Sequence, residues 1–181
     1  MALALARSLV DKRGFDRDAV AAAYSAAISA GIVGGDAEAI WQAAHDHAGN
    51  DSAADAIRAR LAAVRSVAPA DFQRQMGWAL TAFHNAFYWL MAGAPLEEAV
   101  VSTVARGGDT DTNAAVCGAL LGALQGCDAV PLQWRNAILT CRPVAARGMH
   151  YPRPNHYWPD DALELAEALL AAAPHENPLK P

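Results

Sequence analysis

The stretch from residue 78 to residue 90, Trp-Ala-Leu-Thr-Ala-Phe-His-Asn-Ala-Phe-Tyr-Trp-Leu, contains no Asp, Glu, Lys or Arg. Its apolar positions recur every three or four residues, which is the period of an α-helix. One face is formed by Leu80, Phe83, Phe87 and Leu90. A second face is formed by Trp78, Thr81, Asn85 and Tyr88. Because this helix has two such faces and no charged one, we expect it to be surrounded by protein.

The flanking sequence keeps the helical period, and cap residues divide it into further helices. A β-branched run at residues 100–104 favours a strand, but Pro95 before it and Gly107 after it are helix-end signals that outweigh it. We expect helices over residues 2–11, from Asp16 to Ala30 with Gly31 closing it, from Asp36 to before Gly49, from Asp51 or Ser52 through Val64, from Pro95 to Arg106, from Thr112 to Gln125, from Pro131 onward, and from Asp160 or Asp161 to Ala173. The sequence therefore predicts an all-α protein, one compact multi-helix domain over residues 1–173, with a disordered tail at 174–181.

Composition excludes several functional classes. The formal net charge is −5 with no cluster of Lys and Arg, so no surface for nucleic acid is expected. Three cysteines without a C-x-x-C motif argue against a disulfide framework or a zinc knuckle and favour reduced thiols in a cytoplasmic protein. Residues 75–96 lack Asp, Glu, Lys and Arg, but polar side chains and Pro95 favour a buried helix over a membrane span. The N-terminus does not have the pattern of a secretory signal.

The run from Gly107 to Ala115, Gly-Gly-Asp-Thr-Asp-Thr-Asn-Ala-Ala, concentrates oxygen-bearing side chains at the start of a helix. Two glycines allow a sharp turn and a close ligand approach. In an extended lead-in, Asp109 and Asp111 point the same way, and Thr112 can add a hydroxyl or carbonyl oxygen. Two carboxylates about 5 Å apart repel by about 3 kcal/mol at an effective dielectric of about 20. A hard divalent cation such as Mg²⁺, Mn²⁺ or Ca²⁺ offsets that repulsion.

The alternative for the same run is helix capping. Asp and Thr are favourable N-cap residues, and an acid in the first turn gains about 0.5 kcal/mol from the helix dipole. Capping requires one such residue rather than four, and Arg106 can neutralise at most one carboxylate. The residues alone leave both interpretations open.

Gly107 to Ala115 resembles the C-terminal signature of the ADP-ribosylglycohydrolase family, which includes the dinitrogenase-reductase-activating glycohydrolases. Similar runs occur in the family's order at residues 77–80, 85–88, 96–99, 117–123, 133–135 and 157–159. The resemblance is close over residues 72–172 and weaker before them. It implies an all-α hydrolase with a binuclear Mg²⁺ or Mn²⁺ centre that cleaves the bond between C1″ of ADP-ribose and an acceptor.

The resemblance also implies roles for individual residues. Asp109, Asp111 and Thr112 match the family's C-terminal metal ligands. From the residues themselves, further candidates for contact with ADP-ribose or an ADP-ribosylated substrate are Gly107 and Gly108, which allow a close approach, Trp78, whose ring can stack on adenine or ribose, and Asn85, which lies in the central helix. Packing in the core is the competing interpretation for Trp78, and a hydrogen-bonded core pair is the competing interpretation for His84 and Asn85. No catalytic residue and no acceptor can be named from the sequence.

The sequence departs from the family in two places. The family's N-terminal Thr-Asp-Asp stretch and an upstream acid, which supply the remaining metal ligands, have no counterpart here. A second segment, with substrate-contacting loops, has no counterpart near Tyr24 and Ser25. We therefore expect a truncated fold that binds Mn²⁺ weakly and hydrolyses ADP-ribosyl bonds slowly or not at all. A non-catalytic helical module that binds a nucleotide or a partner is the alternative, and exposed apolar surface favours self-association.

Other candidates have simpler explanations. His45 and His47 project about 200° apart on a helix and cannot share a metal ion, so we expect surface residues. The residues Tyr151, His156, Tyr157 and Trp158 belong to a proline-rich loop that either lines a rim or packs on the core.

Overall fold

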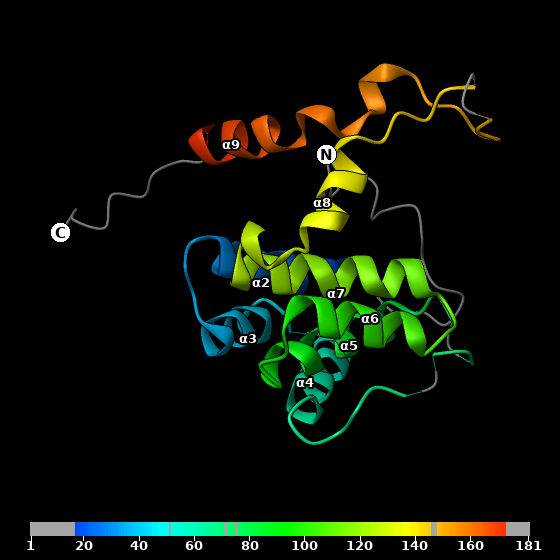
Figure 1. The fold of residues 1–181 in the computed structure, drawn as a ribbon. Helices are drawn as coiled ribbons and strands as arrows, with labels where there is room; N and C mark the ends of the chain where they lie inside the picture. Colours follow the sequence, from blue (N-terminus) through cyan, green and yellow to red (C-terminus); the bar gives the residue numbers. More distant parts are fainter. Residues whose placement is uncertain (1–16, 51, 71, 75, 146–147, 173–181) are drawn as a thin grey trace. The chain divides into compact units, whose positions relative to one another are not determined.

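The computed structural model describes residues 17–50, 52–70, 72–74, 76–145 and 148–172 (Figure 1). Within these ranges every regular element is a helix and no strand occurs, which confirms the all-α class. The chain divides into two compact units, Met1–Val130 and Pro131–Pro181. The prediction of a single domain over residues 1–173 stays a prediction. The helix expected at residues 2–11 and the tail at 174–181 lie outside the described residues.

The first unit contains six α-helices among its described residues and one short 3₁₀ helix. They are α2 (Arg17–Ile32), α3 (Ala37–Asp46), α4 (Ser52–Ala63), α5 (Ala79–Met91), α6 (Leu96–Ala105), α7 (Thr110–Gln125) and η1 (Cys127–Ala129). Helix α7 packs against α2, α5 and α6, and α5 also contacts α2, α3 and α4 (Figure 1). Helix α5 is therefore the central element of this unit.

The core of this unit is built around the uncharged helix α5. Its apolar stripe is confirmed, because Leu80, Phe83, Phe87 and Leu90 are all buried. The rings of Phe83 and Phe87 lie 4.5 Å apart in a tilted arrangement. Burying an aromatic or leucine side chain of this size contributes about 1.5–3 kcal/mol. Because α5 has buried residues on every side, it can hold elements that are distant in sequence in fixed positions.

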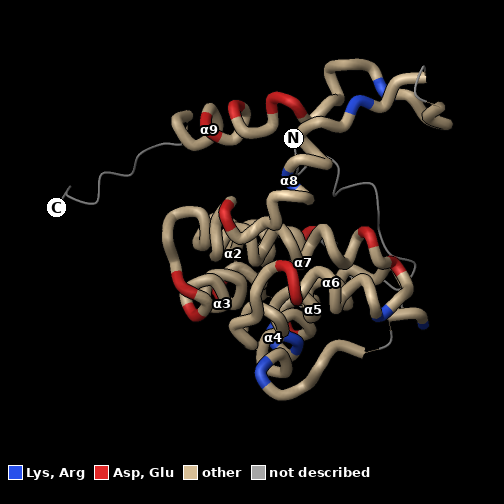
Figure 2. The backbone as a smooth tube through the Cα atoms, viewed as in Figure 1, with Lys and Arg blue, Asp and Glu red and all other residues tan. Residues whose placement is uncertain are grey.

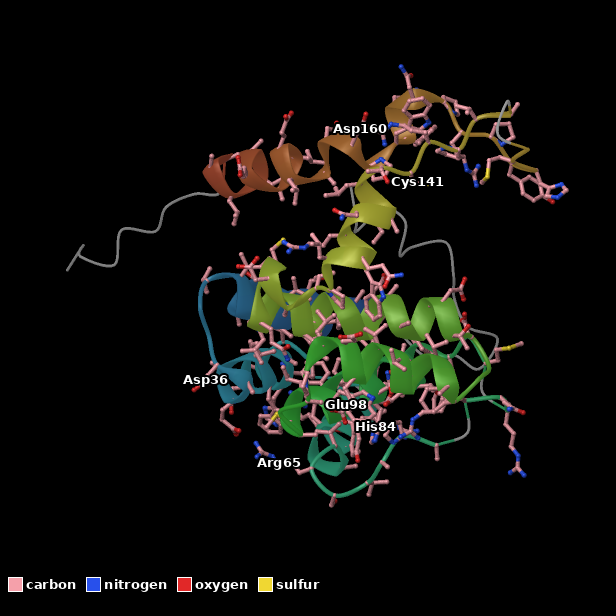
Figure 3. The ribbon with its side chains drawn as sticks, viewed as in Figure 1. Asp36, Arg65, His84, Glu98, Cys141 and Asp160 are labelled. Carbon is pink, nitrogen blue, oxygen red and sulfur yellow. The ribbon has the colours of Figure 1, made fainter. Side chains whose placement is uncertain are left out.

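Helix α3 begins directly after Asp36, the N-cap residue that the sequence predicted. The Asp36 side chain accepts a hydrogen bond of 2.8 Å from the backbone N–H of Ala39 (Figure 3). This is the bond that satisfies one of the unpaired amides at a helix start. On the surface, Nη2 of Arg65 donates to both carboxylate oxygens of Glu38 in this helix, at 2.7 Å to Oε2.

Helix α2 runs past the glycine that was expected to close it. Gly31 lies inside the helix, and Gly34, with φ +93°, follows the helix end. A Cβ on Gly31 would stand 3.0 Å from the Cβ of Ala123 and 3.1 Å from Cδ1 of Ile40. This glycine therefore permits α7 and α3 to approach α2 closely, and the prediction of a helix end at Gly31 was wrong.

The second unit contains two α-helices among its described residues, α8 (Leu132–Leu139) and α9 (Ala162–Ala172), and the 3₁₀ turns η3 (Asn155–Tyr157) and η4 (Pro159–Asp161). Arg142 forms an ion pair of 3.3 Å with Asp160 and lies 5.3 Å from the ring of Trp158. The indole of Trp158 donates a hydrogen bond of 3.0 Å to the carbonyl oxygen of Arg153. Across both units, no helix of the described residues is long and apolar enough to cross a membrane.

Candidate metal-binding turn

The turn between α6 and α7 requires its two glycines. Gly107 and Gly108 have φ angles of +76° and +72°, a region that side chains with a Cβ rarely adopt. A Cβ on Gly108 would also collide with the carbonyl oxygen of Phe72 and would stand 2.8 Å from its carbonyl carbon. The segment around Phe72 therefore packs directly on the backbone of the turn.

Helix α7 begins two residues earlier than the sequence predicted. Its first residue is Thr110, because the backbone N–H of Asn113 already donates a 3.1 Å hydrogen bond to the carbonyl oxygen of Asp109. Asp109 is thus the N-cap residue, while Asp111 lies in the first helical turn rather than in an extended lead-in. The prediction of an extended lead-in through Asp111 was wrong.

The Asp109 side chain is not used for capping. It makes no cap hydrogen bond to the first turn of α7. Its Oδ2 atom instead lies 3.8 Å from the position that a Cβ on Gly77 would occupy. The absence of a side chain at Gly77 therefore leaves space beside this carboxylate. The capping interpretation fails for Asp109, although the carbonyl of this residue does begin the helix.

The Asp111 carboxylate is a close neighbour of Asp109. The pKa of Asp111 is lowered, first by its side-chain hydrogen bond with Asp109. Backbone N–H groups of Thr112 and of Asp111 itself lower the same pKa further. Two carboxyls this close favour sharing one proton or one cation over carrying two unshielded charges. The structure thus brings the two predicted acids together despite the different backbone.

Among the described residues, no arginine forms an ion pair with Asp109 or Asp111. Arg106 donates a hydrogen bond of 2.9 Å to the carbonyl oxygen of Pro69, and its guanidinium lies 5.5 Å from the Phe72 ring and 6.0 Å from the Trp89 ring. Figure 2 shows acidic and basic positions near one another where α6 ends and α7 begins.

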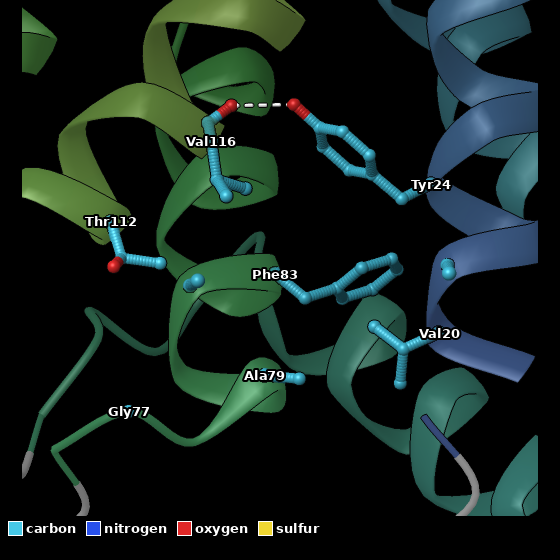
Figure 4. A pocket seen from close by; sticks show the side chains of 9 residues that line it. Val20, Tyr24, Gly77, Ala79, Phe83, Thr112 and Val116 are labelled. Carbon is cyan, nitrogen blue, oxygen red and sulfur yellow. Dashed lines mark hydrogen bonds between the residues drawn. The ribbon is translucent and has the colours of Figure 1, made fainter. Parts of the chain in front are cut away.

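Thr112 lies beside a pocket with mainly apolar walls and a volume of about 250 Å³. The lining residues are Val20, Ala21, Tyr24, Gly77, Ala79, Ala82, Phe83, Thr112 and Val116 (Figure 4). The Tyr24 hydroxyl donates a 2.6 Å hydrogen bond to the carbonyl oxygen of Val116, and burial raises the pKa of Tyr24. Sequence reasoning missed Tyr24 because nothing in α2 signals that its side chain reaches α7.

Trp78 and Asn85 differ in their surroundings. Trp78 is half-buried, and the Arg60 guanidinium lies 5.2 Å from its ring. Asn85 has no exposed surface; its amide donates a 2.9 Å hydrogen bond to Thr103 Oγ1 and accepts a 3.2 Å bond from the Trp89 indole. The structure thus favours the core interpretation of Asn85 over substrate contact.

The histidines of α3 and α5 have separate surroundings. His84 is buried, and its Nε2 bonds at 2.9 Å to the carbonyl oxygen of Val67, while Nδ1 has no partner among the described residues (Figure 3). His84 and Asn85 are therefore both core residues, but they bond to different partners. His45 stacks on Trp41 with ring centroids 5.3 Å apart, and His47 is exposed.

The aromatic loop after α8 lies in the second unit. Tyr151, His156 and Tyr157 are exposed, and Trp158 is half-buried through its contact with Arg142. Within the described ranges, no three side chains of the His, Cys, Asp or Glu types gather closely enough to hold one metal ion. The acidic pair of Asp109 and Asp111 accordingly has no third side chain of these types beside it in the described ranges.

A comparison with known protein families shows which family this chain belongs to. The family model described as ADP-ribosylglycohydrolase matches residues 1–178. The chain belongs to the ADP-ribosylglycohydrolase family. It is also 42% identical over 57 residues to "Putative ADP-ribosyl glycohydrolase L543" of Acanthamoeba polyphaga mimivirus, a match that covers 32% of this chain and 17% of the viral protein. No solved structure matches this ADP-ribosylglycohydrolase family member.

Proposed function

We propose that this family member binds one Mg²⁺ or Mn²⁺ ion through Asp109, Asp111 and Thr112. We further propose that it acts on the glycosidic bond between ADP-ribose and an acceptor. The observation that carries the proposal is the pair of neighbouring carboxyls, neither neutralised by a basic side chain of the described residues. The membership of the family supports ADP-ribose as the ligand.

The residues of the turn fit one cation better than two. Mg²⁺ takes about six oxygen ligands in octahedral geometry. Two carboxylates and one threonine oxygen leave the remaining positions to water, and no third acidic or histidine side chain joins them in the described ranges. We therefore expect weak binding of a single ion by this chain.

The expected chemistry is hydrolysis. A bound divalent ion lowers the pKa of a coordinated water and orients ribose hydroxyl groups. Asp109 and Asp111 bear the negative charge for that site, and both are acids of the α7 start. In the reaction, the water oxygen bonds to C1″, while the bond from C1″ to the acceptor breaks through an oxocarbenium-like state. The acceptor leaves with the electron pair and takes up a proton.

A non-catalytic binding module is the second candidate. It is favoured by the small number of ligands that the described residues bring to the turn. Such a module would keep the helical scaffold and bind ADP-ribose without cleaving it. The two candidates differ in whether bound substrate is converted.

The test is release of ADP-ribose from an ADP-ribosylated peptide, followed with Mn²⁺ and with EDTA. We expect slow release with Mn²⁺, none with EDTA and none for Asp111→Asn. The matched control is Asp55→Asn, because Asp55 is also an exposed acid in a first helical turn, that of α4. Binding of Mn²⁺ and ADP-ribose without any release would select the binding module. Release that is equally fast with EDTA would refute the metal-dependent reaction.

A further inference from the structure

A small cavity with polar side chains in its walls lies between α4, α5 and the loop that follows α4. Its volume is about 130 Å³, and its walls are formed by Arg60, residues 67–70, Thr81 and His84. Arg60 belongs to α4, whereas Thr81 and His84 are three residues apart on α5 and therefore share one face of that helix. Sites for drug-sized molecules have volumes of about 300–1,000 Å³, so this cavity has room for a small ion rather than for a nucleotide.

The His84 side chain, which lines this cavity, has an unused hydrogen-bond acceptor (Figure 3). Its Nε2 lies 2.9 Å from the carbonyl oxygen of Val67, which can only accept, so Nε2 carries the ring hydrogen. Burial lowers the pKa of His84, so the ring is neutral at neutral pH and Nδ1 has a free lone pair. Nδ1 is enclosed and has no hydrogen-bond partner among the described residues. A buried polar atom in this state requires an explanation, and a bound water or ion is a common one.

Arg60 supplies positive charge to the same cavity. Its charge lies near enough to His84 to contribute to the low pKa of that ring. Arg60 forms no ion pair with a described residue, and its guanidinium lies 5.2 Å from the Trp78 ring. Contact with a ring face leaves the N–H donors at the edge of a guanidinium available. The positive charge therefore disfavours a metal cation at Nδ1 of His84 and favours an anion.

We propose that the cavity of Arg60, Thr81 and His84 binds one small oxyanion that keeps a proton, of the hydrogen phosphate class. The Arg60 guanidinium donates to the anionic oxygens, and the O–H of the ligand donates to Nδ1 of His84. The buried Thr81 hydroxyl can donate or accept. A fully deprotonated anion would set a lone pair against that of Nδ1, so the cavity should prefer hydrogen phosphate to sulfate. The cavity shares no lining residue with the acidic turn, and this inference does not depend on the proposed function.

The test compares inorganic phosphate with sulfate by calorimetry on the full chain in EDTA, at about pH 7.5, where His84 is neutral. Most of the phosphate then carries the same charge as sulfate and has the same tetrahedral shape, but only phosphate keeps an O–H. We expect phosphate to bind about tenfold more tightly than sulfate, the effect of one hydrogen bond to a charged group. EDTA removes divalent cations and neither anion contains ribose, so the result is independent of the acidic pair.

Two further measurements identify the residues that hold the anion. Arg60→Gln should bind phosphate about tenfold more weakly than wild type, because it removes the charged donor. The matched control is Arg58→Gln, which makes the same charge change on α4 at a side chain that donates to the Gly49 carbonyl oxygen and does not line the cavity. In wild type, the nitrogen-15 NMR signal of His84 Nδ1 should move upfield when phosphate is added, because a nitrogen that accepts a hydrogen bond is shielded.

The outcomes separate this inference from the proposed function. No binding of phosphate by wild type, equal affinity for phosphate and sulfate, or equal losses in Arg60→Gln and Arg58→Gln would each overturn the assignment. An unchanged Nδ1 signal of His84 at saturating phosphate would also overturn it, and that measurement requires no substitution. A preference for phosphate that is lost in Arg60→Gln alone would support the cavity whether or not Mn²⁺ binds at the acidic turn.

Discussion

The carbonyl group of Phe72 occupies the space that a side chain on Gly108 would need. The same segment reaches Gly107 through Gln73 and borders the Asp109 carboxylate through Gly77. The acidic turn is therefore contacted by Phe72, Gln73 and Gly77, which lie far from it in sequence. The contact between Phe72 and Gly108 therefore links the position of the acidic turn to that of the segment around Phe72.

Replacing Gly108 with alanine should destabilise the protein more than replacing another glycine with a positive φ. Gly93 is the matched control, because its φ is +65° and its Cβ position has no atom within 4 Å. We expect Gly93→Ala to cost about 1–3 kcal/mol from backbone strain. Gly108→Ala should cost about 1–3 kcal/mol more because its methyl group meets backbone. Urea unfolding measures both, and equal losses would contradict the close contact with Phe72.

Removing the Thr103 hydroxyl should leave a buried amide without its partner. Thr103 Oγ1 accepts from Asn85 Nδ2 at 2.9 Å, and both residues have no exposed surface. We expect Thr103→Val to lower the free energy of unfolding by about 1–3 kcal/mol. The Thr103 hydroxyl also donates a 2.7 Å hydrogen bond to the carbonyl oxygen of Ala99, four residues earlier. Thr140→Val is the control, because the Thr140 hydroxyl makes the same kind of bond to Asn136 but is exposed, and its loss should cost less than about 0.5 kcal/mol. Similar losses in the two variants would show that the Asn85 bond contributes little.

The stability of the protein should fall in mild acid because of His84. Burial and the nearby positive charge of Arg60 hold the pKa of His84 below its ordinary value of 6.5. The unfolded state therefore binds more protons in the window between the folded pKa and 6.5. The stabilisation from neutral His84 is complete above this window and is lost as the pH falls through it.

Chemical unfolding at about pH 7.5 and about pH 5.5 checks this expectation. The comparison variant is His84→Gln, whose amide can replace the ring Nε2 as a donor to the Val67 carbonyl oxygen. We expect a smaller decrease in the free energy of unfolding for the variant than for wild type. The same decrease in both proteins would assign the acid sensitivity to other groups.

The sequence was sufficient to predict the helical class and the central helix. The charge-free stretch from residue 78 to residue 90 has a period that only a buried helix satisfies, and cap residues such as Asp36 mark starts that the structure confirms. Gly31 shows where local signals fail. Its role is set by contacts with Ala123 and Ile40, which lie elsewhere in the sequence.

The candidate site was predictable only where its residues are neighbours in sequence. The acids and glycines of the turn are consecutive in sequence, so their proximity follows from local geometry. Phe72, Gln73 and Gly77 reach the turn through tertiary packing, and Tyr24 reaches Val116 of α7 in the same way. No periodic pattern in the sequence predicts those contacts. Asn85 was a candidate for substrate contact because it lies in the central helix, whereas the structure shows it buried and hydrogen-bonded to Thr103 and Trp89.

Calorimetric titration of the full chain with Mn²⁺ tests the metal site most directly. Wild type and Asp55→Asn should show the same weak binding of about one ion, because Asp55 is an exposed acid on a different helix. Asp111→Asn should show no binding, because it removes one of the two neighbouring carboxylates. If all three proteins gave the same titration, whether binding or none, the two acids at the start of α7 would not form a cation site.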